Sequence, residues 1–221
     1  MSSVTDSGIY MGVDVGIKLH VVIRQRLDDN RTRALFIGEV DTFEELGELI
    51  TRYDVRRCVI DALPDIHKAR EFARARRQKV WLAYYDRQDS DHHWVKGKGS
   101  DVPTVHINRV QALDEVFDLF HKGKAELPSD ARHLGGRVEG GVGEFYREMM
   151  ALKRTLEENA QGNWVARYVS EGRADHYAHA ELYCMLAGKT GAHLGGKLLA
   201  VRRIDLSPRR RRGSGWKWGL L

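Results

Sequence analysis

The sequence predicts an α/β fold in which one central mixed sheet is flanked by helices. Runs rich in β-branched and apolar residues come first, joined by short turns as in an antiparallel meander: Ile9–Asp14, Leu19–Gln25 and Ala34–Val40. From residue 42 onward, helical and strand patterns alternate, which is typical of parallel strands joined by helices. We therefore expect three antiparallel strands followed by parallel strands.

The first helix is expected directly after the meander, over 43–50. Thr42 lies at its N-cap position and Glu45 at the capping-box position. A β-α-β unit follows, whose crossover should be right-handed. Its parts are the strand Arg57–Asp61, a helix over Pro64–Ala75 and the strand Lys79–Ala83.

The second half of the chain is less regular. Residues 86–100 are polar, and residues 127–143 form a glycine-rich stretch that we read as a long loop. The remaining expected elements are the strand Val102–Ile107, the helices Arg109–His121 and Glu144–Asn159, the strand Trp164–Tyr168 and a final helix over Arg173–Ala187. We place the folded domain in residues 1–187 and read 188–221 as a basic C-terminal tail.

Composition favours a soluble, intracellular protein that is neither secreted nor embedded in a membrane. The chain has 221 residues, of which 42% are hydrophobic, enough for one sizeable core. It lacks the uninterrupted apolar run of about 18 residues that a membrane span needs, and its start does not resemble a signal peptide. Cys58 and Cys184 have no metal-binding or redox spacing and indicate a reducing compartment.

The positive charge is concentrated in the tail. From Arg202 to the end, seven basic residues face one acid, Asp205, a balance of +6 in a chain whose net charge is +5. The consecutive residues Arg209, Arg210, Arg211 and Arg212 would attract phosphates without reading base sequence. A solubilising terminus explains the same composition equally well.

Three aspartates stand at the ends of the expected elements. Asp14 and Asp61 close short apolar strands, and Asp175 opens the final helix. A carboxylate at such a strand end is costly unless a cation meets it, and these ends face ligand crevices in open α/β sheets. A divalent metal is the first candidate. The alternatives are a turn residue for Asp14, a helix cap for Asp61 and a helix-dipole partner for Asp175.

The order of elements is that of the RNase H-like fold. In that topology the first strand lies beside the fourth, so Asp14 and Asp61 become neighbours, and a late helix brings a third acid, Asp175. Such an arrangement suits two Mg²⁺ or Mn²⁺ ions about 4 Å apart, which clamp the attacking water and the leaving oxygen of a phosphodiester.

Several motifs resemble the nuclease domain of the large terminase subunit of tailed bacteriophages, over about Ile9 to Ala187. The family's late helix commonly reads Asp-His-x-x-Asp-Ala-x-x-Tyr, and here His179 stands where the second acid is usual. The motifs are Gly12-Val13-Asp14-Val15-Gly16, Val59-Ile60-Asp61, Asn108-Arg109, Lys124-Ala125-Glu126-Leu127-Pro128 and Asp175-His176-Tyr177-Ala178-His179-Ala180-Glu181-Leu182-Tyr183.

The resemblance implies a metal-dependent endonuclease that cuts double-stranded viral DNA during genome packaging, in the host cytoplasm. It makes Asp14, Asp61 and Asp175 the catalytic ligands of a two-metal Mg²⁺ or Mn²⁺ site. Portal and small terminase subunit would be partners. The family's nuclease is normally fused behind an ATPase, whereas this sequence has no P-loop motif, so the ATPase would be separate or excised.

Other side chains are expected near the acids or the DNA. Candidates for a supporting role around the metal are His179, Asp65, Lys18 and His20. Asp65 also fits a helix cap, and we expect His176 to be packed or exposed. Lys96 and Lys98, in a stretch with His92-His93-Trp94, fit a DNA-contacting hairpin. The two adjacent histidines should not share a metal, because strand neighbours point to opposite faces.

Two other functions remain open. A Holliday-junction resolvase or another RNase H-like nuclease would cut branched DNA or hybrids by the same chemistry. A non-enzymatic RNase H-like module that binds nucleotide or nucleic acid would share the Gly-x-Asp-x-Gly start. The absence of a second Asp-x-Gly phosphate motif later in the sequence counts against an actin-like ATPase.

Overall fold

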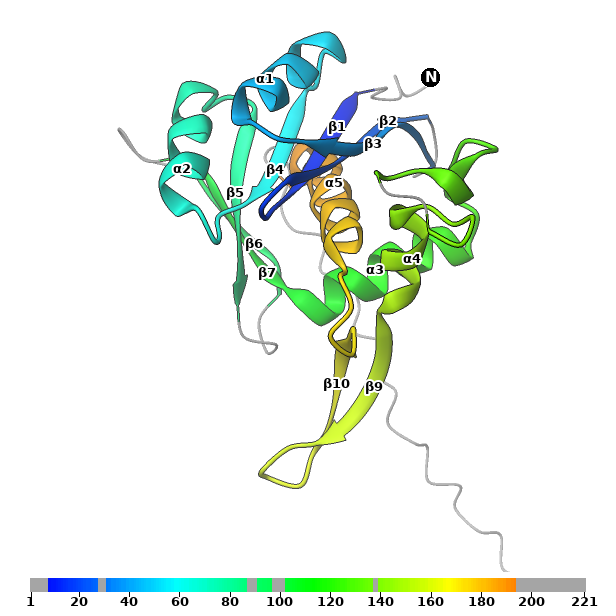
Figure 1. The fold of residues 1–221 in the computed structure, drawn as a ribbon. Coiled ribbons are helices and arrows are strands. Elements are labelled where there is room, and N and C mark those ends of the chain that lie inside the picture. Colours follow the sequence, from blue (N-terminus) through cyan, green and yellow to red (C-terminus); the bar gives the residue numbers. More distant parts are fainter. Residues whose placement is uncertain (1–7, 28–30, 87–90, 97–101, 137–138, 194–221) are drawn as a thin grey trace, which may run out of the picture.

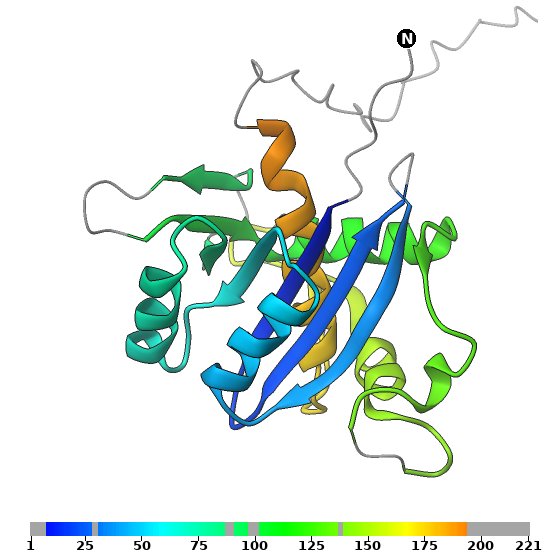
Figure 2. The same ribbon diagram turned by 90° about the horizontal axis from the view of Figure 1, so that it is seen from above.

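A mixed sheet with helices on both faces forms the body of the protein (Figures 1 and 2). The structure is a computed structural model that describes residues 8–27, 31–86, 91–96, 102–136 and 139–193. Within these residues the sheet has eight strands in the order β6-β7-β5-β4-β1-β2-β3-β8. Their bounds are β1 Ile9–Val15, β2 Leu19–Arg26, β3 Thr32–Val40, β4 Arg57–Asp61, β5 Val80–Asp86, β6 His93–Val95, β7 Thr104–Asn108 and β8 Ala125–Glu126.

The strand directions confirm the predicted mixed sheet. Strands β1, β2 and β3 form an antiparallel meander. Strands β4, β5 and β7 then join β1 in parallel, one after the other. At the edges of the sheet, β6 pairs antiparallel with β7 and the short β8 pairs parallel with β3. The first strand therefore lies in the centre of the sheet beside β4, as the topology requires.

Helices cover each face of the sheet over a separate core. On one face lie α1 (Phe43–Arg52) and α2 (Ile66–Ala75), and on the other lie α3 (Arg109–His121), α4 (Glu144–Ala151) and α5 (His176–His193). The alternation of side chains along β1 feeds both cores. Met11, Val13 and Val15 pack on the α1/α2 side, whereas Tyr10 packs on the α5 side.

Local sequence signals set the helix starts. The predicted capping box at Thr42 and Glu45 is present at α1. Helix α2 begins at Ile66, two residues later than predicted, because the Asp65 side chain accepts a hydrogen bond from Lys68 N at 3.1 Å and so caps it. Of the described helices, none is long and apolar enough to cross a membrane.

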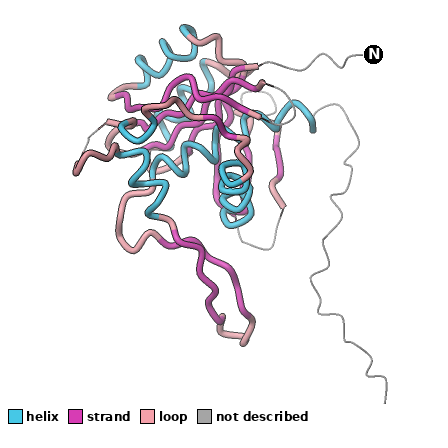
Figure 3. The backbone as a smooth tube through the Cα atoms, turned by 90° about the vertical axis from the view of Figure 1, so that its right-hand side faces the viewer, coloured by secondary structure: helices cyan, strands magenta, loops and turns pink. Residues whose placement is uncertain are grey.

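The predicted helix over Glu144–Asn159 is wrong in its second half. Helix α4 ends at Ala151, and β9 (Lys153–Glu158) pairs antiparallel with β10 (Trp164–Val169) in a hairpin that protrudes from the body (Figures 1 and 3). Residues 153–158 hold a single apolar side chain, so a helix there would have no face to bury. As a strand paired with β10, the same residues satisfy their backbone hydrogen bonds without a buried apolar face.

Helix α5 lies directly on the central strands. A Cβ atom at Gly12 of β1 would lie 2.0 Å from Ala180 O of α5, a distance that any larger residue would have to relieve by moving the helix. Glycine at this position therefore sets the close approach of α5 to β1. The helix starts at His176 and continues to His193, beyond the predicted end at Ala187.

Candidate metal centre

Asp14 and Asp61 lie side by side at the carboxyl ends of neighbouring parallel strands. Gly12 pairs with Val59 and Val13 with Ile60, so the next residues along β1 and β4 are the two aspartates. Both side chains point to the face covered by α5, since they alternate with Val13 and Ile60 of the other core. The predicted adjacency of these two acids is confirmed, and their role as ligands stays a prediction.

Histidines of β2 and α5 surround the Asp14 carboxylate. His176 Nδ1 lies 2.8 Å from Asp14 Oδ2, and the ring of His20 stacks on His176 with centroids 4.5 Å apart. The hydrogen bond to Asp14 and its charge raise the pKa of His176 to about 9. Burial and the charge of His176 lower the pKa of His20. The expectation that His176 is only packed or exposed is therefore wrong.

Asp61 is held by neutral donors. Leu63 N donates to its Oδ1 at 3.0 Å, and the hydroxyl of Tyr183 on α5 donates to its Oδ2 at 2.9 Å. Burial raises the pKa of Asp61, and the nearby charge of Asp14 adds to the increase, although both hydrogen bonds oppose it. The two neighbouring acids thus create a negative, partly desolvated site that favours a cation.

Asp175 immediately precedes α5, and the side chains of Arg109 and His179 lie beside its carboxylate. Its Oδ2 lies 3.4 Å from Arg109 Nη2 and 3.5 Å from His179 Nε2. Burial opposes ionisation, but the hydrogen bond and charge of His179, with the charge of Arg109, outweigh it and lower the pKa of Asp175. His179 Nδ1 also contacts the Tyr85 hydroxyl. These contacts fix Asp175 and His179 as a pair one helical turn apart.

Glu148 of α4 is a buried acid that sequence reasoning missed. Its Oε2 accepts a hydrogen bond from Tyr177 N at 2.8 Å, while its Oε1 is buried without a hydrogen-bond partner in the described part of the chain. Burial raises the pKa of Glu148 to about 7. It lies inside a helix, so no strand end marks it in the sequence. The carboxylate borders a cleft of about 980 Å³, also lined by His20, Glu39, Glu144 and His176.

The other residues that the sequence predicts near the metal or the DNA have contacts of their own, are exposed, or lie outside the described part of the chain. Lys18 forms an ion pair with Glu39 at 2.6 Å at the rim of this cleft, and Asp65 caps α2. Lys96 is exposed just after β6. Lys98 and the arginines of the tail lie outside the described residues: Arg209, Arg210, Arg211 and Arg212.

The residues around Asp14 fit a divalent cation. One ligand atom each from Asp14, His20 and His176 lies within 4.8 Å of the others. The Asp61 carboxylate is close enough for its pKa to be raised by the charge of Asp14. Carboxylate oxygens suit Mg²⁺ and Mn²⁺, and imidazole nitrogens widen the choice toward Mn²⁺ and later transition ions.

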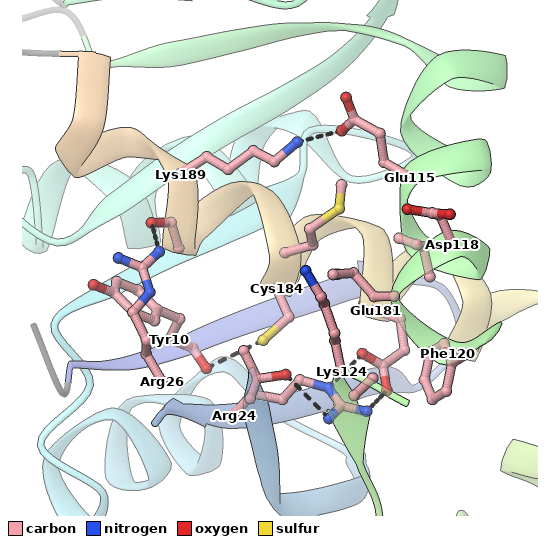
Figure 4. Close-up of a pocket in the computed structure, with 16 residues that line it drawn as sticks. Tyr10, Arg24, Arg26, Glu115, Asp118, Phe120, Lys124, Glu181, Cys184 and Lys189 are labelled. Carbon is pink, nitrogen blue, oxygen red and sulfur yellow. Dashed lines mark hydrogen bonds and ion pairs between the residues drawn. The ribbon is translucent and has the colours of Figure 1, made fainter. Parts of the chain in front are cut away.

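A separate pocket of about 320 Å³ lies further along α5, away from these acids (Figure 4). At its base, Arg24 Nε and Nη2 each donate to a carboxylate oxygen of Glu181 at 2.7 Å. Arg24 Nη1 donates to Glu126 O at 3.0 Å, and the guanidinium lies 5.3 Å from the centroid of the Phe120 ring. The charges of Arg24 and Glu181 therefore neutralise each other.

The fold of this chain is similar to that of solved nuclease structures. No protein-family profile and no curated protein sequence matches the chain. Solved structures do match: the large terminase nuclease from thermophilic phage G20c with bound magnesium has a TM-score of 0.51 at 16% identity, over 82% of each chain. The sheet order and this similarity together show an RNase H-like fold.

Two further solved structures are similar to the chain. The large terminase nuclease domain of Thermus phage P74-26 has a TM-score of 0.48 at 17% identity, covering 80% of this chain and 78% of its own. T. thermophilus RuvC, solved in complex with a Holliday junction substrate, has a TM-score of 0.31 at 15% identity, covering 85% and 96%. The similarity to the G20c nuclease, with its TM-score of 0.51, confirms the resemblance at the level of the fold.

Proposed function

We propose that this protein is a divalent-metal-dependent endonuclease that cleaves double-stranded viral DNA during genome packaging. The observation that carries the proposal is the pair of acids, buried Asp14 and half-buried Asp61, at the ends of adjacent parallel strands under the first turns of α5. The RNase H-like fold and its similarity to a terminase nuclease support the assignment. Packaging components such as the portal, the small terminase subunit and an ATPase would be the partners, in the host cytoplasm.

In this proposal Asp14, Asp61 and Asp175 hold the metal ions. Bound Mg²⁺ or Mn²⁺ would activate the attacking water and stabilise the leaving oxygen of the phosphodiester. The chain's own residues orient the acids: His176 fixes Asp14, while Leu63 N and the Tyr183 hydroxyl fix Asp61. Fixed carboxylates keep the ligand geometry preorganised, which lowers the cost of reorganisation during the reaction.

The DNA backbone would be held by basic groups of the chain. Lys18 stands at its rim, beside Glu39. Lys96, Lys98 and the arginine run of the tail would add phosphate contacts that do not read base sequence. Such contacts suit an enzyme that must cut a long duplex at many positions.

The test is cleavage of supercoiled plasmid by the purified full chain. We expect nicking and linearisation with Mg²⁺ or Mn²⁺, and Mn²⁺ should be at least as effective because it tolerates imperfect octahedral geometry. An EDTA control should show no cleavage. Intact plasmid at micromolar enzyme with either metal would contradict the proposal.

A second arm of the same assay compares substrates. Linear duplex and a four-way junction of equal length are incubated under the same conditions. A packaging nuclease should cut the duplex at least as fast as the junction. Strong preference for the junction would instead identify a resolvase.

A further inference from the structure

Strands β5, β6 and β7, at the β6 end of the sheet, bring together two histidines and an aspartate that the proposed nuclease site does not use. Asp86 ends β5, His93 begins β6 and His106 lies in β7. One ligand atom from each residue lies within 4.8 Å of the other two. We propose that Asp86, His93 and His106 form a second cation site, specific for Zn²⁺ or a similar transition ion.

The strand register explains why these three residues meet. His93 is directly paired with His106, and Asp86 stands one position past Tyr85, which pairs with Ile107. His106 stacks on Tyr84, and Tyr84 packs with the α1/α2 core. The cluster therefore lies on the α1/α2 face of the sheet, opposite to the face that carries Asp14 and Asp61.

Adjacent histidines point in opposite directions here, as expected for a strand. His92 Nδ1 accepts a hydrogen bond from Asn108 N at 3.1 Å, and its Nε2 lies 3.9 Å from Glu115 of α3. His93 turns the other way and stacks on His106, with ring centroids 4.6 Å apart and an angle of 6° between the planes. Each histidine thus serves a different face of the sheet.

The distances are close to those of a bound ion. Ligand atoms around a tetrahedral Zn²⁺ lie about 3.3 Å from one another, given Zn–N and Zn–O bonds near 2.0–2.1 Å. His106 Nδ1 is already 3.2 Å from Asp86 Oδ2, and His93 Nε2 is 4.0 Å from the same oxygen. The His93 side chain is 53% exposed, which leaves it room to rotate toward this oxygen.

The ligand types decide which ion the cluster would take. Two neutral imidazoles and one carboxylate are typical of Zn²⁺ and neighbouring transition ions, whereas Mg²⁺ and Ca²⁺ prefer oxygen ligands. Three protein ligands leave a coordination position for water. The half-exposed side chains would give the ion access from solvent.

An ion at this position would attach β6 to the sheet. Strand β6 has three residues and pairs only with β7 among the described strands; its main additional contact is Trp94, whose ring meets Trp81 edge-on at 5.2 Å. Ligands from β5, β6 and β7 would join three strands through one ion. Binding would therefore stabilise the sheet edge beside Lys96, which we expect to contact DNA.

The test is a Co²⁺ titration followed by visible absorption, since Co²⁺ replaces Zn²⁺ and reports its coordination. The full chain carries Asp14→Asn and His176→Ala, which remove two of the three groups clustered around Asp14 that could hold the ion. We expect one equivalent of Co²⁺ to bind with a visible band that Zn²⁺ abolishes. His93→Gln and His106→Gln should each weaken binding by more than about tenfold, because even outer-shell changes cost 10–100-fold.

The matched control is His67→Gln, a change at an exposed histidine of α2 on the same face of the sheet; it should leave the titration unchanged. A second readout is thermal unfolding: Zn²⁺ should raise the melting temperature of the parent chain but not of Asp86→Asn, which keeps the size of the side chain. Absence of the Co²⁺ band in the parent chain, or equal binding and equal stabilisation in the variants, would overturn the proposal.

Discussion

Two sides of helix α5 meet buried charge in different ways. On one side, Glu181 meets Arg24 in a two-bond ion pair whose side chains are 3% and 5% exposed. On the other side, His176 meets Asp14 and the Tyr183 hydroxyl meets Asp61, next to a cleft that His176 lines. The first side is neutralised by the chain itself, whereas the second keeps an excess of carboxylates.

This difference separates a structural role from a chemical one. A buried ion pair that is fully hydrogen-bonded holds the helix in place, but it offers nothing to a ligand. Acids that lie side by side favour a bound cation, and acids with a raised pKa, such as Asp61 and Glu148, are typical of functional sites. We therefore expect substitutions on the neutralised side to change stability and substitutions on the acidic side to change cleavage.

The largest effect should come from Asp14→Asn and Asp61→Asn. Each variant removes a charge that would hold the metal while it keeps the size of the side chain. Plasmid cleavage should fall by at least about a thousandfold, equivalent to about 4 kcal/mol in the barrier. Circular dichroism should show an unchanged fold.

The matched control for these variants is Asp118→Asn on the exposed surface of α3, where the carboxylate pairs with Lys122. Its cleavage rate should equal that of the parent chain. Wild-type rates in folded Asp14→Asn or Asp61→Asn would show that the strand-end acids are not the site.

Asp175→Asn should have the next largest effect. Asparagine still suits the start of a helix but is a neutral and poorer ligand for a hard ion. If Asp175 holds metal, cleavage should fall by at least about tenfold, with partial recovery at high Mn²⁺ concentration. Comparison with Glu148→Gln identifies the third acid: loss of cleavage in Glu148→Gln alone, at unchanged melting temperature, would transfer that role from Asp175 to Glu148.

Arg24→Met tests the neutralised side of α5. Loss of one partner leaves Glu181 buried and unpaired, so the free energy of unfolding should fall by about 3–5 kcal/mol. The exposed pair of Arg33 and Glu126, at 3.1 Å, supplies the control, since Arg33→Met should cost less than about 1 kcal/mol. Denaturant titration measures both. Equal losses would mean that burial of the Arg24 pair does not matter.

The smallest effect should follow removal of the residues after Ser207. Deletion of the four arginines should flatten the dependence of DNA affinity on salt, because each phosphate contact releases counterions. The rate of cleavage at saturating DNA should not change. A salt slope equal to that of the full chain would show that the tail does not contact DNA.

The sequence predicted the elements whose signals are local. Alternation and turns located β1, β2, β3, β4 and β5, and the capping box located α1. The prediction for residues 153–158 is wrong because these residues include good helix formers. Only their pairing with β10 makes them a strand. The adjacency of Asp14 and Asp61 was predictable because it follows from topology alone.

The rest of the site depends on register and helix rotation, which a single sequence does not specify. The sequence alone predicts that His176 is packed or exposed, because it does not show which face of α5 meets Asp14. Arg24 and Glu181 are 157 positions apart, and nothing local links them. The same holds for Asp86, His93 and His106, which meet only once three strands are aligned.

The most direct test of the central claim measures metal at Asp14 and Asp61 themselves. Mn²⁺ binding is followed by electron paramagnetic resonance in the presence of duplex DNA, in a His93→Gln background that removes the second cluster. We predict that binding is weak without DNA, strengthens with it, and is lost in both Asp14→Asn and Asp61→Asn but retained in Asp118→Asn. Equal Mn²⁺ binding in all four proteins would contradict the claim that these two acids form the metal centre.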